Sequence, residues 1–254
     1  MKSFEDPIVA VVIGSNRGIG LAFVQQLLFS PMVDTVYAGC RNLESARDLD
    51  DAVKTYGTRV VPIAVDVTSS ESIEDLRNRL EFDGAQPNLV INCAGLLHDR
   101  ELQPEKRLED VTPDGLRRYF DCNSIGPVLL MKAVKHVIPS QQRVVIANLS
   151  ARVGSLSDNK LGGWYGYRAS KAAQNMFTRN IAIELGRRNK KLVCIGLHPG
   201  TVDTDLSRPF QRSVPSQLLC SADTSAKRLL GVIDRLSPEE SGGFYAYDGS
   251  RIPW

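Results

Sequence analysis

The chain has 254 residues, of which 43% are hydrophobic and 24% are charged, as is usual for a globular protein. Its 31 basic and 29 acidic side chains give a net charge of +2, which argues against a nucleic-acid-binding or membrane-surface protein. No apolar run approaches the ~18 residues of a membrane helix, and the run over residues 8–13 is too short for a signal sequence.

Strand-length apolar runs recur along the chain. They are rich in Val and Ile, and most are continuous, which is typical of strands buried on both faces of a sheet. They span residues 8–13, 35–40, 59–65, 89–93, 143–149, 192–197 and 243–247.

Segments with helical spacing of apolar residues separate these strands. One helix is expected to begin after Thr68 or Ser69, because either residue can cap it. The other expected helices span residues 20–30, 113–138, 165–188 and 221–236. This alternation predicts a doubly wound α/β fold, with a parallel sheet and helices on both faces. We find no linker, and therefore expect one domain over residues 1–254.

The cysteine pattern indicates the cellular compartment in which the protein works. The cysteines are odd in number, and no two of them form a C-x-x-C pair. They stand at Cys40, Cys93, Cys122, Cys194 and Cys220. We therefore expect reduced thiols in a cytoplasmic protein, and neither a disulfide framework nor a metal site.

A glycine-rich turn follows the first strand and opens the first helix. The sequence GSNRGIG places Gly14, Gly18 and Gly20 where a tight turn and a closely approaching phosphate require residues without a side chain. The N-terminus of the helix then offers free N–H groups and the positive end of a dipole to a pyrophosphate. This position predicts a dinucleotide-binding site.

The end of the second strand indicates which dinucleotide binds. NAD-preferring proteins carry an acidic residue there, whereas this chain reads Cys40-Arg41-Asn42. Arg41, together with Arg17 in the glycine turn, can hold a 2′-phosphate through bidentate hydrogen bonds. We therefore predict NADP(H) in preference to NAD(H). The alternative is that both arginines are merely solvated.

Six motifs in order resemble the short-chain dehydrogenase/reductase family over nearly the whole chain. They are the GSNRGIG turn, Asp66-Val67, Asn92-Cys93-Ala94-Gly95, Asn123, Tyr167-x-x-x-Lys171 and Pro199-Gly200. The segments GGWYGYRASKAAQNM and GGFYAYDGSRIPW resemble its C-factor and sniffer-type carbonyl reductase branch. The resemblance implies a single Rossmann domain with strand order 3-2-1-4-5-6-7. The turn departs from the family at Ile13, where threonine is usual.

The resemblance also implies which residues hold the cofactor. Those after the third strand would frame the adenine, those after the fourth would line the centre of the cofactor, and those after the sixth would face the nicotinamide. The full set is Gly14, Asn16, Arg17, Gly18, Ile19, Gly20, Arg41, Asp66, Val67, Asn92, Ala94, Gly95, Tyr167, Lys171, Pro199, Gly200, Val202 and Thr204.

A tyrosine and a lysine carry the predicted chemistry. Reducing a carbonyl requires a proton donor, and a phenol with a pKa near 10 needs help to act as one. Lys171 follows Tyr167 by four residues and lies on the same helix face, where its ammonium favours the phenolate. Tyr165 has Ala169 at that spacing. By resemblance, Asn123 joins Lys171 in a proton relay.

The serine that completes such sites is missing. The family places it three residues before a glycine, and with Gly154 as that glycine the position holds Ala151. Ser150 lies next to it, but neighbouring side chains of a strand point to opposite faces. Ser150 would serve only if the chain turned there, or if the short insertion over residues 159–163 shifted the alignment. Ser155 and Ser157 are further candidates on the following loop.

Two functions fit these observations. The first is an NADPH-dependent carbonyl reductase acting on a ketone, aldehyde or quinone, which the pair Tyr167 and Lys171 favours. The second is a weakly active or inactive NADP(H)-binding sensor, which Ala151 favours. We prefer the first.

The substrate and the oligomeric state are less defined. The substrate would lie under residues 96–102, Trp164 and the segment 201–221, which is either a binding loop or a disordered surface excursion. The outer faces of the helices over 113–138 and 165–188 are candidates for pairing in a homodimer.

Overall fold

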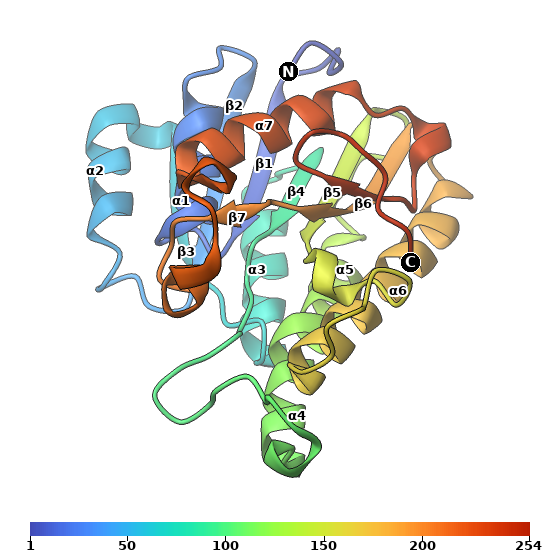
Figure 1. Ribbon diagram of the computed structural model, residues 1–254. Coiled ribbons are helices and arrows are strands. Elements are labelled where there is room, and N and C mark those ends of the chain that lie inside the picture. The colour runs from blue at the N-terminus through green and yellow to red at the C-terminus, as the bar shows by residue number, and fades with distance from the viewer.

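A sheet of seven parallel strands forms the centre of the structure (Figure 1). The structure is a computed structural model, and it describes the backbone of residues 1–254 and every side chain except those of Ser213 and Ser216. The strands are β1 (Ile8–Ile13), β2 (Val33–Cys40), β3 (Val60–Ala64), β4 (Leu89–Asn92), β5 (Val144–Leu149), β6 (Leu192–His198) and β9 (Phe244–Ala246). Their order, β3-β2-β1-β4-β5-β6-β9, confirms the predicted Rossmann fold.

Helices cover both faces of this sheet. One face carries α1 (Gly18–Leu28), α2 (Arg47–Tyr56) and α7 (Ala222–Arg235), and the other carries α3 (Ser70–Phe82), α5 (Gly126–Val134) and α6 (Tyr165–Gly186) (Figure 1). Ser69 is the residue that caps α3, because its Oγ accepts a hydrogen bond of 3.2 Å from Ser72 N. None of the described helices is long and apolar enough to cross a membrane.

The strands distribute their side chains between the two helix layers. In β1, Ala10 and Val12 point into the layer of α1 and α7, whereas Val11 and Ile13 point into the layer of α3 and α5. All four side chains are at most 1% exposed. Burial on both faces explains why the strands appear as continuous apolar runs. Each buried Val or Ile contributes about 1.5–3 kcal/mol to stability.

One α-helix of the structure, α2, is missing from the helices predicted from the sequence. Its residues read RDLDDAVKTY, in which Leu49, Ala52, Val53 and Tyr56 recur at the i, i+3, i+4, i+7 spacing of an amphipathic helix. Leu49 and Ala52 are buried, and Val53 and Tyr56 pack partly buried against the same core, so the helical period was present in the sequence and was overlooked.

The helix expected over 113–138 is interrupted. It consists of α4 (Pro113–Phe120), a π-helical turn over Asp121–Ile125, and α5, which ends at Val134. π-Helical turns inside α-helices occur frequently at functional sites. The predicted residue Asn123 lies in this turn.

The segment 201–221 has regular structure of its own. Its ends pair as two short parallel strands, β7 (Thr201–Val202) and β8 (Leu219–Cys220). Between them lie the 3₁₀ helices Arg208–Ser213 and Ser216–Leu218. A loop closed at its base in this way fits the expected binding loop, and not a surface excursion without structure.

Candidate active site

The carboxyl ends of the central strands bring the predicted motifs to one edge of the sheet. Ile13 at the end of β1 pairs with Gly39 of β2 and with Asn92 of β4. Asn92 pairs in turn with Asn148 of β5, which pairs with Gly196 of β6. The segments that follow these residues therefore lie side by side, at the edge where open α/β sheets bind ligands.

The glycine turn has the shape of a phosphate cradle. Gly14 and Gly18 have φ angles of +78° and +56°, which favour glycine. A Cβ atom on Gly14 would lie 3.0 Å from Ala94 N, and one on Gly20 would lie 2.0 Å from Gly14 O. No side chain caps the N-terminus of α1, so its N–H groups remain available to an anion. These residues therefore fit a dinucleotide pyrophosphate.

The two arginines predicted to bind the 2′-phosphate differ in their surroundings. Arg17 Nη1 lies 2.9 Å from Asp205 Oδ2 in the loop 201–221, and the two side chains are 60% and 54% exposed. Arg208 Nη1 lies 2.9 Å from the other oxygen of the same carboxylate. Arg41 is exposed, and no described carboxylate lies within 4 Å of it. An exposed pair such as Arg17–Asp205 contributes only ~0.2–1 kcal/mol and can exchange for a phosphate.

The remaining cofactor candidates after β3 and β4 hold their own loops in place. Asp66 Oδ1 accepts hydrogen bonds from the backbone N and the Oγ1 of Thr68, at 2.9 and 2.7 Å. Asn92 Oδ1 accepts a hydrogen bond of 3.2 Å from Ala94 N. A Cβ atom on Gly95 would lie 3.7 Å from Lys171 Nζ. The segment after β4 therefore runs close to the predicted catalytic lysine.

The segment after β6 approaches the glycine turn from the other side. Thr204 lies beside Gly18, with its Cγ2 at 3.3 Å from an ideal Cβ there. Ser225 Oγ of α7 donates a hydrogen bond of 3.0 Å to Pro199 O. Gly200 has a φ of +80° and packs against the ring of Tyr247. The structure thus brings the first and last cofactor motifs together across the edge of the sheet.

Of the two tyrosines at the start of α6, Tyr165 and Tyr167, only Tyr167 is buried. It is 7% exposed, whereas Tyr165 is 40% exposed. The ring of Tyr167 packs edge-to-face on Tyr119 and Trp164, with centroids 6.2 and 6.1 Å away. Burial raises the pKa of the Tyr167 phenol above its ordinary value, so the phenol is protonated at neutral pH.

Lys171 lies beneath the tyrosine ring, as the helix spacing predicts. Its Nζ is 5.9 Å from the centroid of the Tyr167 ring. The ammonium donates hydrogen bonds to Leu149 O at 2.8 Å and to Gln174 Oε1 at 3.1 Å, and the residue is 3% exposed. Burial lowers the pKa of Lys171 to about 8. The group therefore changes charge within reach of physiological pH.

Asn123 is fully buried in the π-helical turn. Its Oδ1 accepts a hydrogen bond from Leu96 N at 2.7 Å, and its Nδ2 donates to Leu96 O at 2.8 Å and to Ser170 Oγ at 3.0 Å. The amide therefore fixes the segment after β4 against the helix that carries Tyr167 and Lys171. The backbone of Leu96 thus satisfies the buried amide, beside the predicted catalytic residues Tyr167 and Lys171.

The hydroxyl groups near Ala151 are bonded elsewhere. Ser150 N donates to Leu197 O at 2.8 Å and thus continues the sheet, and Ala151 is extended, with φ −142° and ψ 144°. The two side chains therefore point to opposite faces. Ser150 Oγ donates to Asn175 Oδ1 at 2.7 Å, whereas Ala151 packs in the cluster around Tyr167.

The serines on the following loop are also bonded away from the site. Ser155 Oγ donates to Pro253 O at 2.6 Å, and Ser157 Oγ donates to Trp254 O at 2.5 Å. Neither replaces the serine that is expected at Ala151.

Aromatic and apolar side chains cover Tyr167. Phe210, from the loop 201–221, stacks edge-to-face on Trp164, with centroids 4.9 Å apart. His98 packs against Phe210, and its Nε2 lies 3.2 Å from Leu206 O. No motif in the sequence points to His98 or Phe210, because this cover forms only when distant segments meet.

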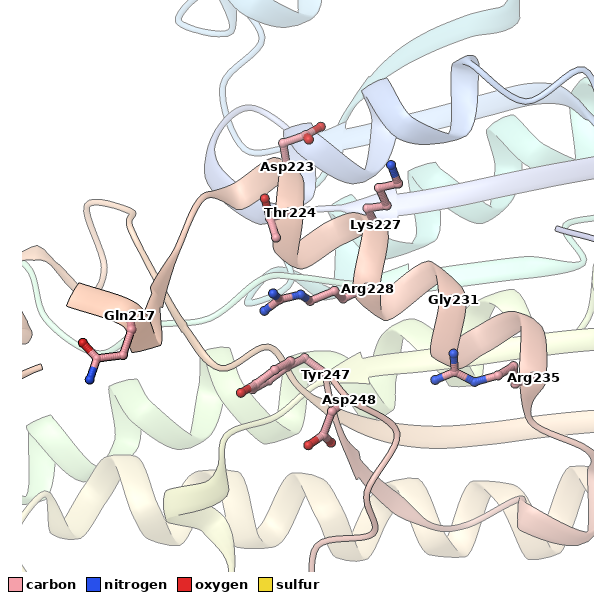
Figure 2. Close-up of a pocket in the computed structure, with 9 residues that line it drawn as sticks. All are labelled: Gln217, Asp223, Thr224, Lys227, Arg228, Gly231, Arg235, Tyr247 and Asp248. Carbon is pink, nitrogen blue, oxygen red and sulfur yellow. The ribbon is translucent and has the colours of Figure 1, made fainter. Parts of the chain in front are cut away.

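A cleft of about 860 Å³ lies beside α7 and adjoins this site, because Tyr247 in its lining packs on Gly200 (Figure 2). Arg228 and Arg235 reach from α7 toward the turn of Tyr247 and Asp248. Arg228 lies over the Tyr247 ring, 5.3 Å from its centroid, and the same ring contacts Gly200. The cleft contains none of the predicted catalytic or cofactor residues.

Comparisons with known proteins agree with this arrangement. The family described as short chain dehydrogenase matches residues 8–214. The chain is 34% identical over 244 residues to "1-hydroxy-2-glutathionyl-2-methyl-3-butene dehydrogenase" of Rhodococcus sp. (strain AD45), which covers 96% of this chain and 98% of that protein. The chain therefore belongs to the short-chain dehydrogenase/reductase family and is an oxidoreductase.

Two solved structures narrow the similarity within this family. The carbonyl reductase Sniffer of D. melanogaster has a TM-score of 0.85 and 27% identity, covering 98% of this chain and 100% of that one. An NADPH-bound carbonyl reductase from chicken fatty liver has a TM-score of 0.87 and 28% identity, with the same coverage. These similarities support the sniffer-type branch that the sequence predicts.

Proposed function

We propose that the protein is an NADP(H)-dependent carbonyl reductase that converts a ketone, aldehyde or quinone to the alcohol. The buried pair of Tyr167 and Lys171, at the edge of the sheet that meets the glycine turn, carries this proposal. The solved carbonyl reductases that the chain resembles support it. When bound, NADPH supplies the hydride.

In the proposed reaction Tyr167 is the general acid. Its phenol donates a proton to the carbonyl oxygen of the substrate, and the ammonium of Lys171 stabilises the phenolate that forms. Asn123 maintains the geometry, because it ties Leu96 and Ser170 together beside the pair. In the proposed relay a solvent proton then returns to Tyr167 past Lys171 and Asn123.

The cofactor would lie along the carboxyl edge of the sheet. We propose that Gly14, Gly18 and Gly20 hold its pyrophosphate and that Arg17 and Arg41 hold its 2′-phosphate. The other candidates of the sequence, including Asn16, Ile19, Val67 and Val202, follow or line the same edge. The cytoplasmic location and the homodimer stay predictions.

One assay tests the proposed function. The protein is mixed with NADPH and a panel of ketones, aldehydes and quinones, and cofactor absorbance is followed. We expect at least one compound to be reduced faster than by the Tyr167→Phe variant, which retains the ring but lacks the acidic proton. If no compound exceeds the Tyr167→Phe rate while NADPH still binds, the reductase function is wrong.

The same assay addresses the second candidate function. Ala151 stands where a hydroxyl is expected, and the hydroxyls of Ser150 and Ser155 are bonded to other groups. This favours a protein that binds NADP(H) but turns over weakly or not at all. Binding without any Tyr167-dependent reduction would support such a sensor.

The pKa of Lys171 predicts how the reduction depends on pH. As the pH rises through about 8, Lys171 loses its charge, and Tyr167 becomes a poorer acid. We expect kcat for reduction at pH 9 to be about tenfold below that at pH 7. A kcat profile measured over pH 6–10 at saturating substrate checks this.

Unfolding does not account for the expected fall in kcat between pH 7 and pH 9. The unfolded chain has a lysine pKa near its ordinary value of 10.5, so the folded chain binds fewer protons between pH 8 and 10.5. Lys171 therefore makes folding more favourable as the pH rises in that window. A flat kcat profile up to pH 10 would contradict a role for the Lys171 charge.

Asp205 should weaken NADPH binding, because its carboxylate pairs with Arg17. In the Asp205→Asn variant Arg17 is free to bind the 2′-phosphate, and a negative charge near that phosphate is lost. We expect the Kd for NADPH to fall by up to about fivefold, which is the scale of an exposed ion pair. The Kd for NADH should stay the same. Fluorescence titration with both cofactors measures this, and an equal change for both would contradict it.

A further inference from the structure

Trp164 has an unusual backbone conformation directly before the catalytic helix. With φ 52° and ψ 44° it is the left-handed N-cap of α6, and it is the one non-glycine residue of the described backbone with a positive φ. A bulky side chain is strained there, and such strain persists only where surrounding contacts enforce it. Strained residues concentrate at active sites and ligand clamps.

Glu105 supplies those contacts from 61 residues away. Its backbone O accepts a hydrogen bond of 2.5 Å from Trp164 N. Both of its carboxylate oxygens lie 3.2 Å from Gly166 N. Glu105 is only 4% exposed, and a buried carboxylate is costly unless it is hydrogen-bonded. The residue therefore holds the first turn of α6 and the backbone of Trp164 together.

The strained conformation directs the indole to the catalytic tyrosine. The Trp164 ring lies 6.1 Å from Tyr167, at 78° between the ring planes, and its other neighbour is Phe210. The rest of this cluster is apolar and includes Leu102 and Val153. Phe210 packs edge-to-face on Trp164, so the indole already accommodates one aromatic ring.

We propose that Trp164 recognises the substrate of the proposed reductase, by packing its indole against a flat apolar ring attached to the carbonyl group. Glu105 is the positioning residue that fixes Trp164 for this contact. In this proposal a substrate ring takes the place of Phe210, which the loop 201–221 supplies. The inference rests on the proposed function, because the substrate carbonyl must also reach Tyr167.

The first test compares acetonaphthone, a flat aromatic ketone, with butanone, a small aliphatic one. In Trp164→Gly, glycine accepts the left-handed backbone while the ring is lost. We expect the ratio of kcat/KM for acetonaphthone over butanone to fall about tenfold, the scale of an aromatic contact with its buried area. Relief of the strain should offset part of the packing lost with Tyr167 and Phe210, so the thermal unfolding midpoint should fall less than in a variant that keeps a Cβ atom at this position.

Matched variants separate recognition from structure. Trp164→Ala should lose the same ratio but unfold at a lower temperature than Trp164→Gly, because alanine remains strained. Phe82→Ala, which truncates a ring that is 89% exposed and remote from the site, should change neither quantity. An unchanged ratio in Trp164→Gly, or a lower unfolding midpoint together with equal losses for both ketones, would overturn the proposal.

The second test measures the fluorescence of Trp164 directly and does not require catalysis. The chain has two tryptophans, so Trp254→Phe leaves Trp164 as the sole indole. Acetonaphthone added in the presence of NADP⁺ should quench its fluorescence, with a half-saturation close to KM. Glu105→Gln keeps an acceptor for Gly166 N and should shift this value only slightly, whereas Glu105→Ala should raise it several-fold.

The two readouts distinguish failure of the inference from failure of the proposed function. Saturable quenching without any Tyr167-dependent reduction would leave the recognition site in place and refute the reductase. Tyr167-dependent reduction of acetonaphthone without quenching would leave the reductase and refute the role of Trp164.

Discussion

Replacing Ala151 with serine should raise kcat for carbonyl reduction by about 10²–10³-fold, because removing one such donor from other enzymes costs that factor. In the proposed reaction, negative charge develops on the carbonyl oxygen as the carbonyl carbon is reduced and before the proton of Tyr167 arrives, and a second hydrogen-bond donor would stabilise that charge. Ala151 packs in the cluster around Tyr167, so a hydroxyl at this position faces the same space as the phenol. Steady-state rates with the best substrate of the panel measure the gain.

Two matched variants show whether the hydroxyl itself is responsible. Ala151→Val adds similar bulk without a donor, and its kcat should not rise. Ser150→Ala removes the hydroxyl that donates to Asn175 Oδ1. It should lower the free energy of unfolding by about 1–3 kcal/mol while kcat changes little. An Ala151→Ser enzyme no faster than the wild type would mean that another group already binds the carbonyl oxygen.

Local patterns in the sequence predict most of the fold and the two residues proposed for proton transfer. Continuous apolar runs predict the strands, because each strand is buried between two helix layers. The choice of Tyr167 over Tyr165 follows from helix geometry alone, and the structure buries Tyr167 beside Lys171. Whether Ser150 can face the site depends on whether the chain turns there. Only the structure answers this question, because it shows that the backbone stays extended through Ala151.

Contacts between distant segments were beyond the reach of the sequence. The ion pair of Arg17 with Asp205 joins residues 188 positions apart, and neither residue shows a pattern that points to the other. The same holds for Glu105 and Gly166. The π-helical turn around Asn123 also escapes a reading of periodicity, since one extra residue in a turn barely disturbs the spacing of apolar positions.

The double variant Arg17→Ala/Arg41→Ala should weaken NADPH binding by about 10²-fold. This factor already allows for the screening of each exposed arginine–phosphate contact by solvent. NADH has no 2′-phosphate, so its Kd should change by less than about twofold. The register of β1 with β2 pairs Ile13 with Gly39, and both arginines follow these residues closely in sequence. Both arginines therefore follow neighbouring strands at the same edge of the sheet, where the proposed 2′-phosphate would lie. Titrations with both cofactors at fixed ionic strength measure the two affinities.

A control variant at a distant arginine and a double-mutant cycle test whether the loss of NADPH affinity is specific to Arg17 and Arg41. Arg117→Ala removes an exposed cation that pairs with Asp114, and it should leave both affinities unchanged. The Asp205→Asn variant provides the stricter check. If Asp205 weakens NADPH binding by occupying Arg17, then Asp205→Asn should lose most of its benefit on an Arg17→Ala background. An equal benefit on both backgrounds would mean that Asp205 acts only through its charge, and an equal loss of NADPH and NADH in the double arginine variant would refute the 2′-phosphate assignment.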